Sequence, residues 1–363
     1  MKILFEIRHP AHFHHFIFTI NELKRRNHEV KVIVSYKDVL SDLLYKAQVD
    51  YQVIGRNVAG IRNKIIELMK QNVRVFKVCQ KFRPDLFIGR PSQTVTLNSK
   101  ILSIPSIVFA EDDFNAVFFN AMAAYPFANI ILTPYVTKLG PFEYKKIGYS
   151  GYQKLAYLHP NKFTPDVKFI KKYIDVSVPY FILRFSKLSA IHDINASGFT
   201  KELAYQIIEM LKPHGNIYIS SEKYIEEEFK KYKIKVPPDR IHHALHFSDI
   251  FISDSQTMTM EAALLGTPSL RYSSFVGKLS YLEELEWKYQ LSFGFKINEK
   301  DKLVKKISDI LNLSDAKALW NNRVNNMLKE KIDVTDFMIW FIENYPKSVQ
   351  TMKVNPDYQY KFR

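Results

Sequence analysis

The sequence contains a single cysteine, Cys79, and has no run of about 18 consecutive apolar residues. A single cysteine cannot form a disulfide within the chain, which favours a reducing compartment. Without a long apolar run, no membrane-spanning segment is expected. Residues 1–10 make too short an apolar stretch, too soon interrupted by charge, for a signal peptide. These absences predict a cytoplasmic protein without a transmembrane segment.

Signatures of nucleic-acid binding are also missing, although the formal net charge is +15. The sequence has no zinc-finger pattern, no RNP signature and no basic helix-turn-helix pattern, so nucleic acid is not favoured as a partner. The charge instead predicts attraction to phosphorylated substrates or to an anionic membrane surface. A solvated, lysine-rich surface is the alternative interpretation.

Apolar runs of strand length alternate with amphipathic stretches over most of the 363 residues. This alternation predicts βαβ units, parallel sheets and an α/β fold. The runs expected to form strands are 2–7, 29–35, 51–55, 85–90, 105–112 and 129–134, followed by 179–186, 216–221, 249–254 and 268–273.

The alternation is interrupted at 146–166, where glycine, proline and tyrosine replace it. We therefore expect an amino-terminal domain over 1–165 and a second domain over 166–334. A carboxyl-terminal helix and tail follow over 335–363, and the helix near 335–350 is expected to pack back on the first domain. Two Rossmann-like parallel-sheet domains facing each other across a cleft are the simplest architecture for this pattern.

The segment 249–274 predicts an anion site in the second domain. Its apolar strand ends at Asp254, and Asp254 or Ser255 can cap a helix that opens with Ser255, Gln256 and Thr257 and ends before Gly266. Free N–H groups at such a helix start favour a phosphate. Glu261 lies about 9 Å further along the helix, roughly the distance from a diphosphate to a ribose. A capped helix with a surface glutamate is the alternative.

The loop that follows the first strand of the second domain is also cationic. Arg184 and Lys187 could neutralise a diphosphate, and Ser186 could donate a hydrogen bond to it. The alternative is a basic surface loop.

Residues 8–16 hold His9, His12, His14 and His15. Pro10 suits the first turn of a helix, and helical geometry then points these side chains in different directions. They cannot converge on one ion, so no metal site is expected. A polar face is expected to contain His15 with Thr19, Glu22 and Arg26.

The string "SDSQTMTMEAALLGTPSL" resembles the sugar-nucleotide motif of GT-B glycosyltransferases and UDP-N-acetylglucosamine 2-epimerases. The resemblance implies that Ser255, Gln256 and Thr257 contact phosphate and that Glu261 contacts ribose. Together with "HPAH", "GYQKLAYLHP" and "RFSKLSAIHD", the motif is similar to a largely uncharacterised bacterial and archaeal family of GT-B-type glycosyltransferases. That similarity covers most of the chain.

The stretch from Ala11 and His12 to "RRNHEV" resembles a layout found in many GT-B enzymes, including the lipid-dependent N-acetylglucosaminyltransferase of peptidoglycan synthesis. There a glycine precedes the histidine, whereas this chain has Ala11 and lacks the glycine-rich loop. The resemblance implies that His12 acts as a base or positions the acceptor. An imidazole titrates in the right range for that role. A capping or structural histidine is the alternative.

Acidic residues follow another predicted strand of the first domain. Glu111, Asp112 and Asp113 could orient His12, take part in catalysis or bind acceptor hydroxyls, and a divalent metal or a simple helix start are alternatives. Because the GT-B resemblance implies chemistry without a metal or a cofactor, neither is expected, and the nucleotide-sugar is a substrate.

Two arginines bear on the choice between transferase and epimerase. The related epimerases carry an acidic residue after the strand that here reads "PDLFIGR", and this chain has Arg90 there. Arg8 is retained near the epimerase arginine. The missing carboxylate favours a transferase, with Arg8, Arg90 and Asp113 on the acceptor side. Arg90 could bind an anionic acceptor group or pair with Asp112 or Asp113.

The stretch 63–83 predicts a long helix with an apolar stripe surrounded by basic residues. The stripe comprises Ile65, Ile66, Met69, Val73, Phe76 and Cys79. With the apolar, aromatic segment 115–130, this helix could dock on an anionic inner leaflet, which would make the protein peripheral at the plasma membrane. A helix packed on the sheet with a lysine-rich outer face is the alternative.

These features predict a metal-independent GT-B glycosyltransferase that moves a sugar from a UDP-linked donor to a cell-surface glycan or a lipid-linked acceptor. A UDP-sugar 2-epimerase or hydrolase is an alternative enzyme. A non-catalytic module that binds sugar nucleotides or glycans is the alternative from another class, since a fold does not determine a function.

Overall fold

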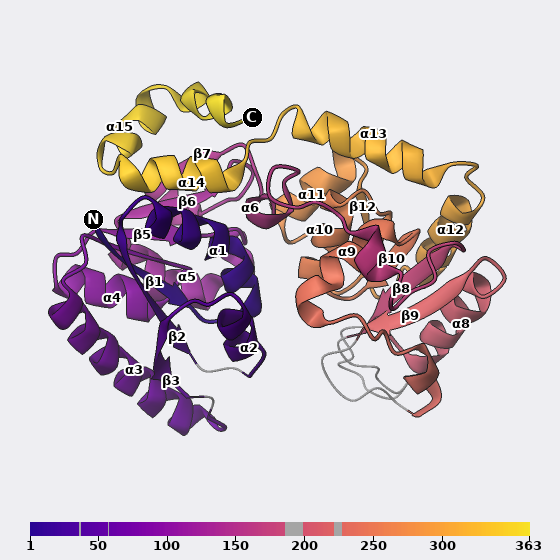
Figure 1. Ribbon diagram of the computed structural model, residues 1–363, viewed down its shortest axis with the longest axis horizontal. Coiled ribbons are helices and arrows are strands. Elements are labelled where there is room, and N and C mark those ends of the chain that lie inside the picture. Colours follow the sequence, from indigo (N-terminus) through magenta and orange to yellow (C-terminus); the bar gives the residue numbers. More distant parts are fainter. Residues whose placement is uncertain (36–37, 57, 186–198, 221–226) are drawn as a thin grey trace. The chain divides into compact units, whose positions relative to one another are not determined.

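The computed structural model describes residues 1–35, 38–56, 58–185, 199–220 and 227–363 (Figure 1). The chain forms two compact units. Unit 1 contains 1–162 and 331–363, and unit 2 contains 163–330. The limits expected from the sequence were 165/166 and 334/335. The predicted α/β fold with two parallel sheets is confirmed.

Unit 1 is built on a seven-stranded parallel sheet with the order β3-β2-β1-β4-β5-β6-β7. Its strands are β1 (Lys2–Ile7), β2 (Glu29–Ser35), β3 (Tyr51–Gly55), β4 (Leu86–Gly89), β5 (Ser106–Phe109), β6 (Ile130–Pro134) and β7 (Lys146–Tyr149). The first six coincide with predicted runs to within a few residues. The strand β7 was not predicted, because this short edge strand contains Gly148 and lacks a continuous apolar run.

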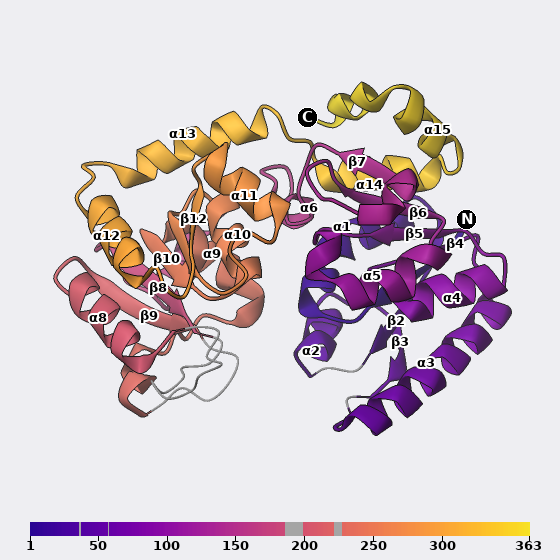
Figure 2. The same cartoon turned by 180° about the vertical axis from the view of Figure 1, so that it is seen from behind.

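Helices cover both faces of this sheet. One face carries α3 (Ile61–Phe82), α4 (Gln93–Ile101) and α5 (Phe118–Ala124), with α4 in contact with both neighbours (Figure 2). On the other face α1 (Pro10–Arg25) packs through Phe16 against Phe5 of β1, with ring centroids 5.5 Å apart. The helices α2 (Asp38–Lys46), α6 (Leu155–Leu158) and α14 (Val334–Glu343) contact α1.

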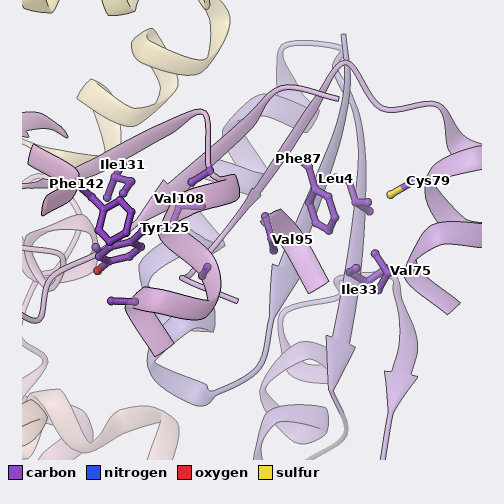
Figure 3. Close-up of a cluster of buried hydrophobic side chains, with 14 of the residues drawn as sticks. Leu4, Ile33, Val75, Cys79, Phe87, Val95, Val108, Tyr125, Ile131 and Phe142 are labelled. Atoms are coloured by element: carbon purple, nitrogen blue, oxygen red, sulfur yellow. The ribbon is translucent and has the colours of Figure 1, made fainter. Parts of the chain in front are cut away.

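A continuous apolar cluster fills the space between the sheet and the α3, α4 and α5 layer (Figure 3). The cluster includes Leu4, Ile33, Val75, Cys79, Phe87, Val95, Val108, Tyr125, Ile131 and Phe142. Burying this apolar surface is the main favourable contribution to folding of the unit. Burial also raises the pKa of the Cys79 thiol to about 12, so this cysteine is an unreactive core residue.

In the amino-terminal half of α3 the predicted apolar stripe does not face the sheet. Of the predicted apolar stripe, Cys79 is buried, whereas Ile65, Met69 and Val73 are exposed. The side that faces the sheet in this half carries polar residues, described below. The interpretation of α3 as an ordinary helix whose apolar stripe packs on the sheet is therefore wrong for its first half.

After unit 2 the chain returns to unit 1. The backbone N–H of Ile332 donates to the carbonyl of Ser150 at 2.9 Å, and the Thr335 hydroxyl donates to the carbonyl of Ala156 at 2.7 Å. The helix expected near 335–350 is two helices, α14 and α15 (Lys347–Val354). The carboxyl-terminal segment thus completes the helical layer over α1.

Unit 2 has a five-stranded parallel sheet with the order β12-β11-β10-β8-β9. Its strands are β8 (Tyr180–Arg184), β9 (Asn216–Ser220), β10 (Ile250–Ser253), β11 (Ser269–Tyr272) and β12 (Ser292–Phe295). The last of these was not predicted. Its helices include α7 (Val167–Ile170), α8 (Lys201–Leu211), α9 (Ile241–Phe247), α10 (Gln256–Leu264), α11 (Ser280–Trp287), α12 (Lys300–Leu311) and α13 (Ala316–Leu328). Among the described residues no helix is both long enough and apolar enough to cross a membrane.

Candidate functional site

The start of α10 in unit 2 is the predicted phosphate site, and the structure shows how it is built. Ser255 is the N-cap, and its hydroxyl accepts the N–H of Met258 at 3.4 Å. The Ser253 hydroxyl accepts the N–H of Ser255 at 2.8 Å, and the Thr259 hydroxyl donates to the Ser255 carbonyl at 2.6 Å. These bonds fix the turn from strand to helix at the carboxyl edge of the sheet.

Gln256 and Thr257 are the first two residues of α10 and are half-buried. Backbone N–H groups in this position have no partner within a helix, so they are suited to an anion. The helix ends at Leu264, and Gly266 follows with φ +79°. A Cβ there would lie 2.7 Å from Oδ1 of Asn321, so both backbone and packing require glycine.

Glu261 is buried in the second turn of α10, with an exposure of 4%. Its carboxylate lies 3.4 Å from Nε2 of His242 on α9, which is also buried. The alternative of a surface glutamate is therefore wrong. A carboxylate is stable in such a place only with polar partners, and His242 is one that the sequence analysis did not identify.

Arg184 lies at the carboxyl end of β8, where its Nη1 donates to the Ser220 hydroxyl at 3.3 Å. In the strand register Arg184 pairs with Ser253, and Ser253 pairs with Arg271 of β11. Paired residues of neighbouring parallel strands share a face of the sheet, so Arg184 and Arg271 lie on either side of Ser253. The predicted residues Ser186 and Lys187 lie outside the described residues.

Arg271 was missed by the sequence analysis. Its side chain is 1% exposed, and its Nη2 lies 3.8 Å from the Glu283 carboxylate. The other guanidinium nitrogens, Nε and Nη1, have no hydrogen-bond partner among the described residues. Burial lowers the pKa of Arg271, against the raising effect of Tyr281 and the nearby glutamates. The signal in the sequence was a charged residue within the buried strand "SLRY".

In unit 1, Arg8 follows β1 at the carboxyl edge of the sheet. Its Nη2 donates to Oε1 of Gln71 at 2.6 Å, and its Nε donates to the Ser35 hydroxyl at 3.2 Å. The same Nε lies 3.8 Å from Glu6, whose fully buried carboxylate also accepts the Ser92 hydroxyl at 2.6 Å. Arg8 is therefore held in place by side chains from separate elements.

His12 is half-buried in the first turn of α1. Its Nδ1 accepts the backbone N–H of Arg8 at 3.3 Å. In a neutral ring with this bond, the proton resides on Nε2. Burial, and then the charge of Arg90, holds the pKa of His12 well below its ordinary value. The ring is therefore neutral at pH 7, as a base must be.

The other histidines of this segment have separate places. His9 caps α1 by accepting the N–H of Ala11 at 3.2 Å, and His14 lies 5.3 Å from the ring of Tyr157. His15 is buried rather than on a polar face, with its ring 5.2 Å from that of Phe109. The predicted polar face is thus wrong at His15, because α1 turns this residue toward β5.

The remainder of the predicted polar face is divided between core and surface. Thr19 is fully buried. Glu22 and Arg26 lie at the surface, where Nε of Arg26 donates to Glu22 at 2.7 Å and its Nη1 donates to Glu343 of α14 at 2.8 Å. The periodicity could not reveal this division, because α14 comes from the other end of the chain.

Arg90 lies at the carboxyl end of β4 and hydrogen-bonds through Nη1 to Oε1 of Gln153. Its charge acts on the pKa values of His12, His15 and the buried tyrosines Tyr125 and Tyr149.

Several groups around Arg90 have unfilled hydrogen-bonding capacity. The hydroxyls of Tyr125 and Tyr149, Nε2 of Gln153 and both ring nitrogens of His15 have no partner among the described residues. Burial raises the pKa of Tyr125 to about 12, so its hydroxyl stays protonated. Such groups are costly unless a ligand or water satisfies them.

The acidic segment after β5 has more than one role. Glu111 is 1% exposed, pairs with the ammonium group of Lys154 and accepts the N–H of Gln153 at 2.9 Å. Asp113 is buried and accepts the N–H of Lys138 at 2.7 Å. Asp112 between them is half-buried. The carboxylate of Glu111 is therefore held in a buried ion pair that positions Gln153 beside Arg90.

Metal ligands do not gather in the described parts of either unit. Within the part of the chain that the structure describes, no group of three or more His, Cys, Asp or Glu side chains could hold a metal ion.

The buried imidazole of His15 predicts a pH-dependent stability. Burial, together with Arg90 and Lys154, holds the pKa of His15 well below its ordinary value. The unfolded chain binds the proton that the folded chain excludes, so stability is complete above about pH 6.5 and is lost as the pH falls below it. We expect His15→Phe to reduce the slope of the free energy of unfolding against pH, below about pH 6.5, by at most about 1.4 kcal/mol per pH unit.

The measurement is hydrogen exchange of unit 1 peptides at pH 7, 6 and 5, corrected for the intrinsic exchange rate. His214→Phe, at an exposed histidine of unit 2, is the control. An unchanged pH dependence in His15→Phe would show that other groups carry the effect.

The family described as "Protein of unknown function (DUF354)" matches residues 1–347. None of the curated proteins matches the sequence. Solved structures with the same fold include the S. aureus MnaA–UDP co-structure, with 12% identity and a TM-score of 0.68 over 98% of this chain and 97% of that chain.

Two further structures are those of an epimerase and a glycosyltransferase. UDP-GlcNAc 2-epimerase from Neisseria meningitidis, bound to UDP-GlcNAc, has 16% identity and a TM-score of 0.61 over 91% of this chain and 99% of that chain. The glycosyltransferase SsfS6 from Streptomyces sp. SF2575, complexed with thymidine diphosphate, has 13% identity and a TM-score of 0.60 over 94% and 99%. This chain therefore has a GT-B-type fold, and it belongs to the family DUF354.

Proposed function

We propose that this protein is a glycosyltransferase that moves a sugar from a UDP-linked donor to a glycan or lipid-linked acceptor without a metal ion. The observation that carries the proposal is the arrangement at the carboxyl edge of the unit 2 sheet. There the start of α10 lies beside a row of side chains that contains two arginines, Arg184 and Arg271, on either side of Ser253.

This arrangement suits a diphosphate. The N–H groups of Gln256 and Thr257 and the hydroxyl of Ser255 donate to phosphate oxygens. Arg184 and Arg271 balance the charge that a metal ion would otherwise balance, and Arg271 has donors that its protein partners do not use. Glu261, further along α10, accepts hydrogen bonds from the ribose hydroxyls.

We assign acceptor activation to unit 1. His12 takes the proton of the acceptor hydroxyl, and the resulting oxygen attacks the anomeric carbon of the sugar. The bond from that carbon to the diphosphate oxygen breaks as the new bond forms, and the electron pair leaves with UDP. The cations and N–H groups of unit 2 stabilise the departing diphosphate. Direct displacement of this kind inverts the anomeric configuration.

The polar groups around Arg90 support binding of a hydroxyl-rich acceptor. Tyr125, Tyr149 and Gln153 offer hydrogen-bonding atoms that nothing in the described chain satisfies. The ion pair of Glu111 with Lys154 holds Gln153, and we assign it a positioning role. Asp112 and Asp113 stay candidates for contacts with acceptor hydroxyls.

Other structures of this fold support a nucleoside diphosphate, free or linked to a sugar, as the class of ligand. They include complexes described as containing UDP, UDP-GlcNAc and thymidine diphosphate. The base preference of this chain is tested by thermal shift across nucleoside diphosphates, where UDP is expected to raise the melting temperature most.

The donor site is tested by titration calorimetry with UDP. We expect Glu261→Gln to weaken UDP binding about tenfold to a hundredfold, because hydrogen bonds to a charged acceptor contribute roughly 1.5–3 kcal/mol. Glu209→Gln, at an exposed glutamate of unit 2, is the matched control and is expected to bind UDP as wild type does. Equal affinity in the two variants would remove Glu261 from the donor site.

An assay with UDP-GlcNAc in the absence of acceptor separates the transferase from the alternatives. We expect neither a 2-epimer nor free UDP to accumulate in a proton NMR time course. Formation of the 2-epimer would contradict the transferase proposal and favour an epimerase. Arg8, which lies near the position of the epimerase arginine, would then be the residue shared with those enzymes. Donor binding without turnover across acceptors would favour a binding module.

A further inference from the structure

The outward face of α3 is apolar where a surface helix is normally polar. Its exposed apolar residues include Ile61, which is 81% exposed, and Met69, which is 65% exposed. The inward-facing Glu67 and Gln71 are 8% and 7% exposed. The first half of the helix thus reverses the usual distribution of apolar and polar residues.

The reversed inner face has a structural reason. Gln71 accepts the guanidinium of Arg8 at 2.6 Å, and Glu67 accepts the N–H of Arg56 at 3.1 Å and Nη1 of Arg74 at 2.8 Å. These bonds explain the polar residues inside. They do not explain the apolar residues outside, which gain nothing from contact with water.

A second exposed apolar group lies in the same helical layer. Phe119 of α5 is 85% exposed, and Phe118, Met122 and Phe127 are exposed beside it. The segment 114–127 contains no Asp, Glu, Lys or Arg. Figure 2 shows α3, α4 and α5 side by side over the same face of the unit 1 sheet. We call the outward surface of α3 and α5 the α3–α5 face.

The charges of this face have one sign. The exposed cations on α3 are Arg62, Lys64, Lys70, Lys77 and Lys81. The helix has one carboxylate, Glu67, which is buried and paired with Arg74. Two copies of the chain brought together through this face would place like charges in contact, which disfavours a dimer. An apolar surface surrounded by cations matches an anionic lipid surface.

We propose that the α3–α5 face docks on a bilayer that contains anionic phospholipid. The aromatic and aliphatic side chains enter the headgroup region, and the lysines contact lipid phosphates while their stems cover apolar surface. If the proposed transferase function holds, docking also serves the acceptor, because the inner face of the same helix holds Arg8. A lipid-linked acceptor would then be presented to the unit 1 site from the membrane.

The test is flotation of the full-length chain with vesicles of phosphatidylglycerol and phosphatidylcholine, or of phosphatidylcholine alone, without nucleotide. We expect the wild type to float with the anionic vesicles at least about tenfold more than with the neutral ones, and less so as salt is raised.

Two sets of substitutions probe the two parts of the surface. Ile65→Ser/Met69→Ser/Phe119→Ser removes apolar contacts at exposed positions, and we expect flotation to fall about tenfold or more. Its control carries the same number of exposed apolar substitutions elsewhere, Tyr45→Ser/Trp287→Ser/Val354→Ser.

Lys64→Glu/Lys70→Glu/Lys77→Glu is expected to abolish flotation with anionic vesicles. Lys300→Glu/Lys302→Glu/Lys305→Glu, on α12, changes the net charge equally and is expected to float as wild type does.

Several results would overturn the proposal. One is equal flotation of each variant and its control. Another is loss of flotation in the lysine variant but not in the apolar variant, together with binding of the wild type to DNA as strong as its binding to anionic vesicles. That result would indicate a surface for polyanions in general. A third is a dimer by light scattering that dissociates in the Ile65, Met69 and Phe119 variant, which would assign the face to self-association. UDP affinity is measured in parallel, so failure of docking and failure of the transferase proposal are distinguishable.

Discussion

Substitution of His12 by Ala or Gln is expected to slow sugar transfer about 10²–10⁴-fold, the usual contribution of general base catalysis, while UDP affinity stays unchanged. Affinity is expected to be retained because all the groups that we propose for donor binding lie in unit 2. The measurement is initial-rate transfer with a donor and acceptor pair, together with calorimetry of UDP binding. His14→Gln, two residues further along α1, is the control.

The glutamine variant is informative because of the hydrogen bond that His12 makes. Its Nδ1 accepts the N–H of Arg8 at 3.3 Å, so the neutral ring donates from Nε2. A base must accept a proton at Nε2, which requires the other tautomer and loss of that long bond. A hydrogen bond of this kind contributes only about 0.5–1.5 kcal/mol, so the change of tautomer adds little to the free-energy barrier of turnover. Glutamine can donate from the same position but cannot act as a base.

The pH profile gives an independent readout. Burial and the charge of Arg90 hold the pKa of His12 well below its ordinary value, so the base is expected to stay active at pH 6, where an exposed imidazole is largely protonated. A His12→Gln variant that transfers sugar within about tenfold of wild type would limit His12 to hydrogen-bond donation.

Lys154→Met is expected to destabilise unit 1 by about 3–5 kcal/mol, the cost of leaving a buried charge unpaired. The Glu111 carboxylate is 1% exposed and forms its ion pair with Lys154. Without the ammonium group, hydrogen bonds such as that from the N–H of Gln153 are left to stabilise its charge. Urea unfolding followed by hydrogen exchange of unit 1 peptides measures the loss, since two units need not unfold in one transition.

The double variant Glu111→Gln/Lys154→Met removes both charges and is expected to recover most of the lost stability. Lys230→Met breaks the exposed pair with Glu227 in unit 2 and is expected to change stability far less, because solvent screens an exposed pair. Equal destabilisation in the single and double variants would show that packing of the lysine stem matters, and not the charge of Glu111.

Local patterns in the sequence were sufficient for the class of fold. Strands such as β4 and β10 contain continuous apolar runs bounded by polar residues, so the local pattern alone identifies them. A cap at Asp254 or Ser255 and a left-handed Gly266 follow from residue type; the structure confirms Gly266 and has Ser255 as the cap. The family DUF354 and the GT-B-type fold agree with the resemblance carried by the "SDSQTMTMEAALLGTPSL" motif. The further resemblance to the lipid-dependent transferase stays a prediction.

Features that depend on distant parts of the chain could not be read from local patterns. His15 is buried because α1 packs on β5. The helix α14, which covers α1, comes from the other end of the chain. Arg26 and Glu343, whose side chains join the two, are 317 positions apart in the sequence. The outward apolar stripe of α3 has the spacing of a core stripe. Only the partners of Gln71 and Glu67 reveal which side of the helix faces inward.

The same distinction applies to the candidate site. The amino-acid order alone identified a helix start at Asp254 or Ser255, because capping and N–H exposure are properties of a few consecutive residues. The pairing of Arg184 with Ser253, and of Ser253 with Arg271, was decided by strand order and register in the folded sheet. Register depends on packing between strands far apart in sequence, so this arginine row exists only in the tertiary structure.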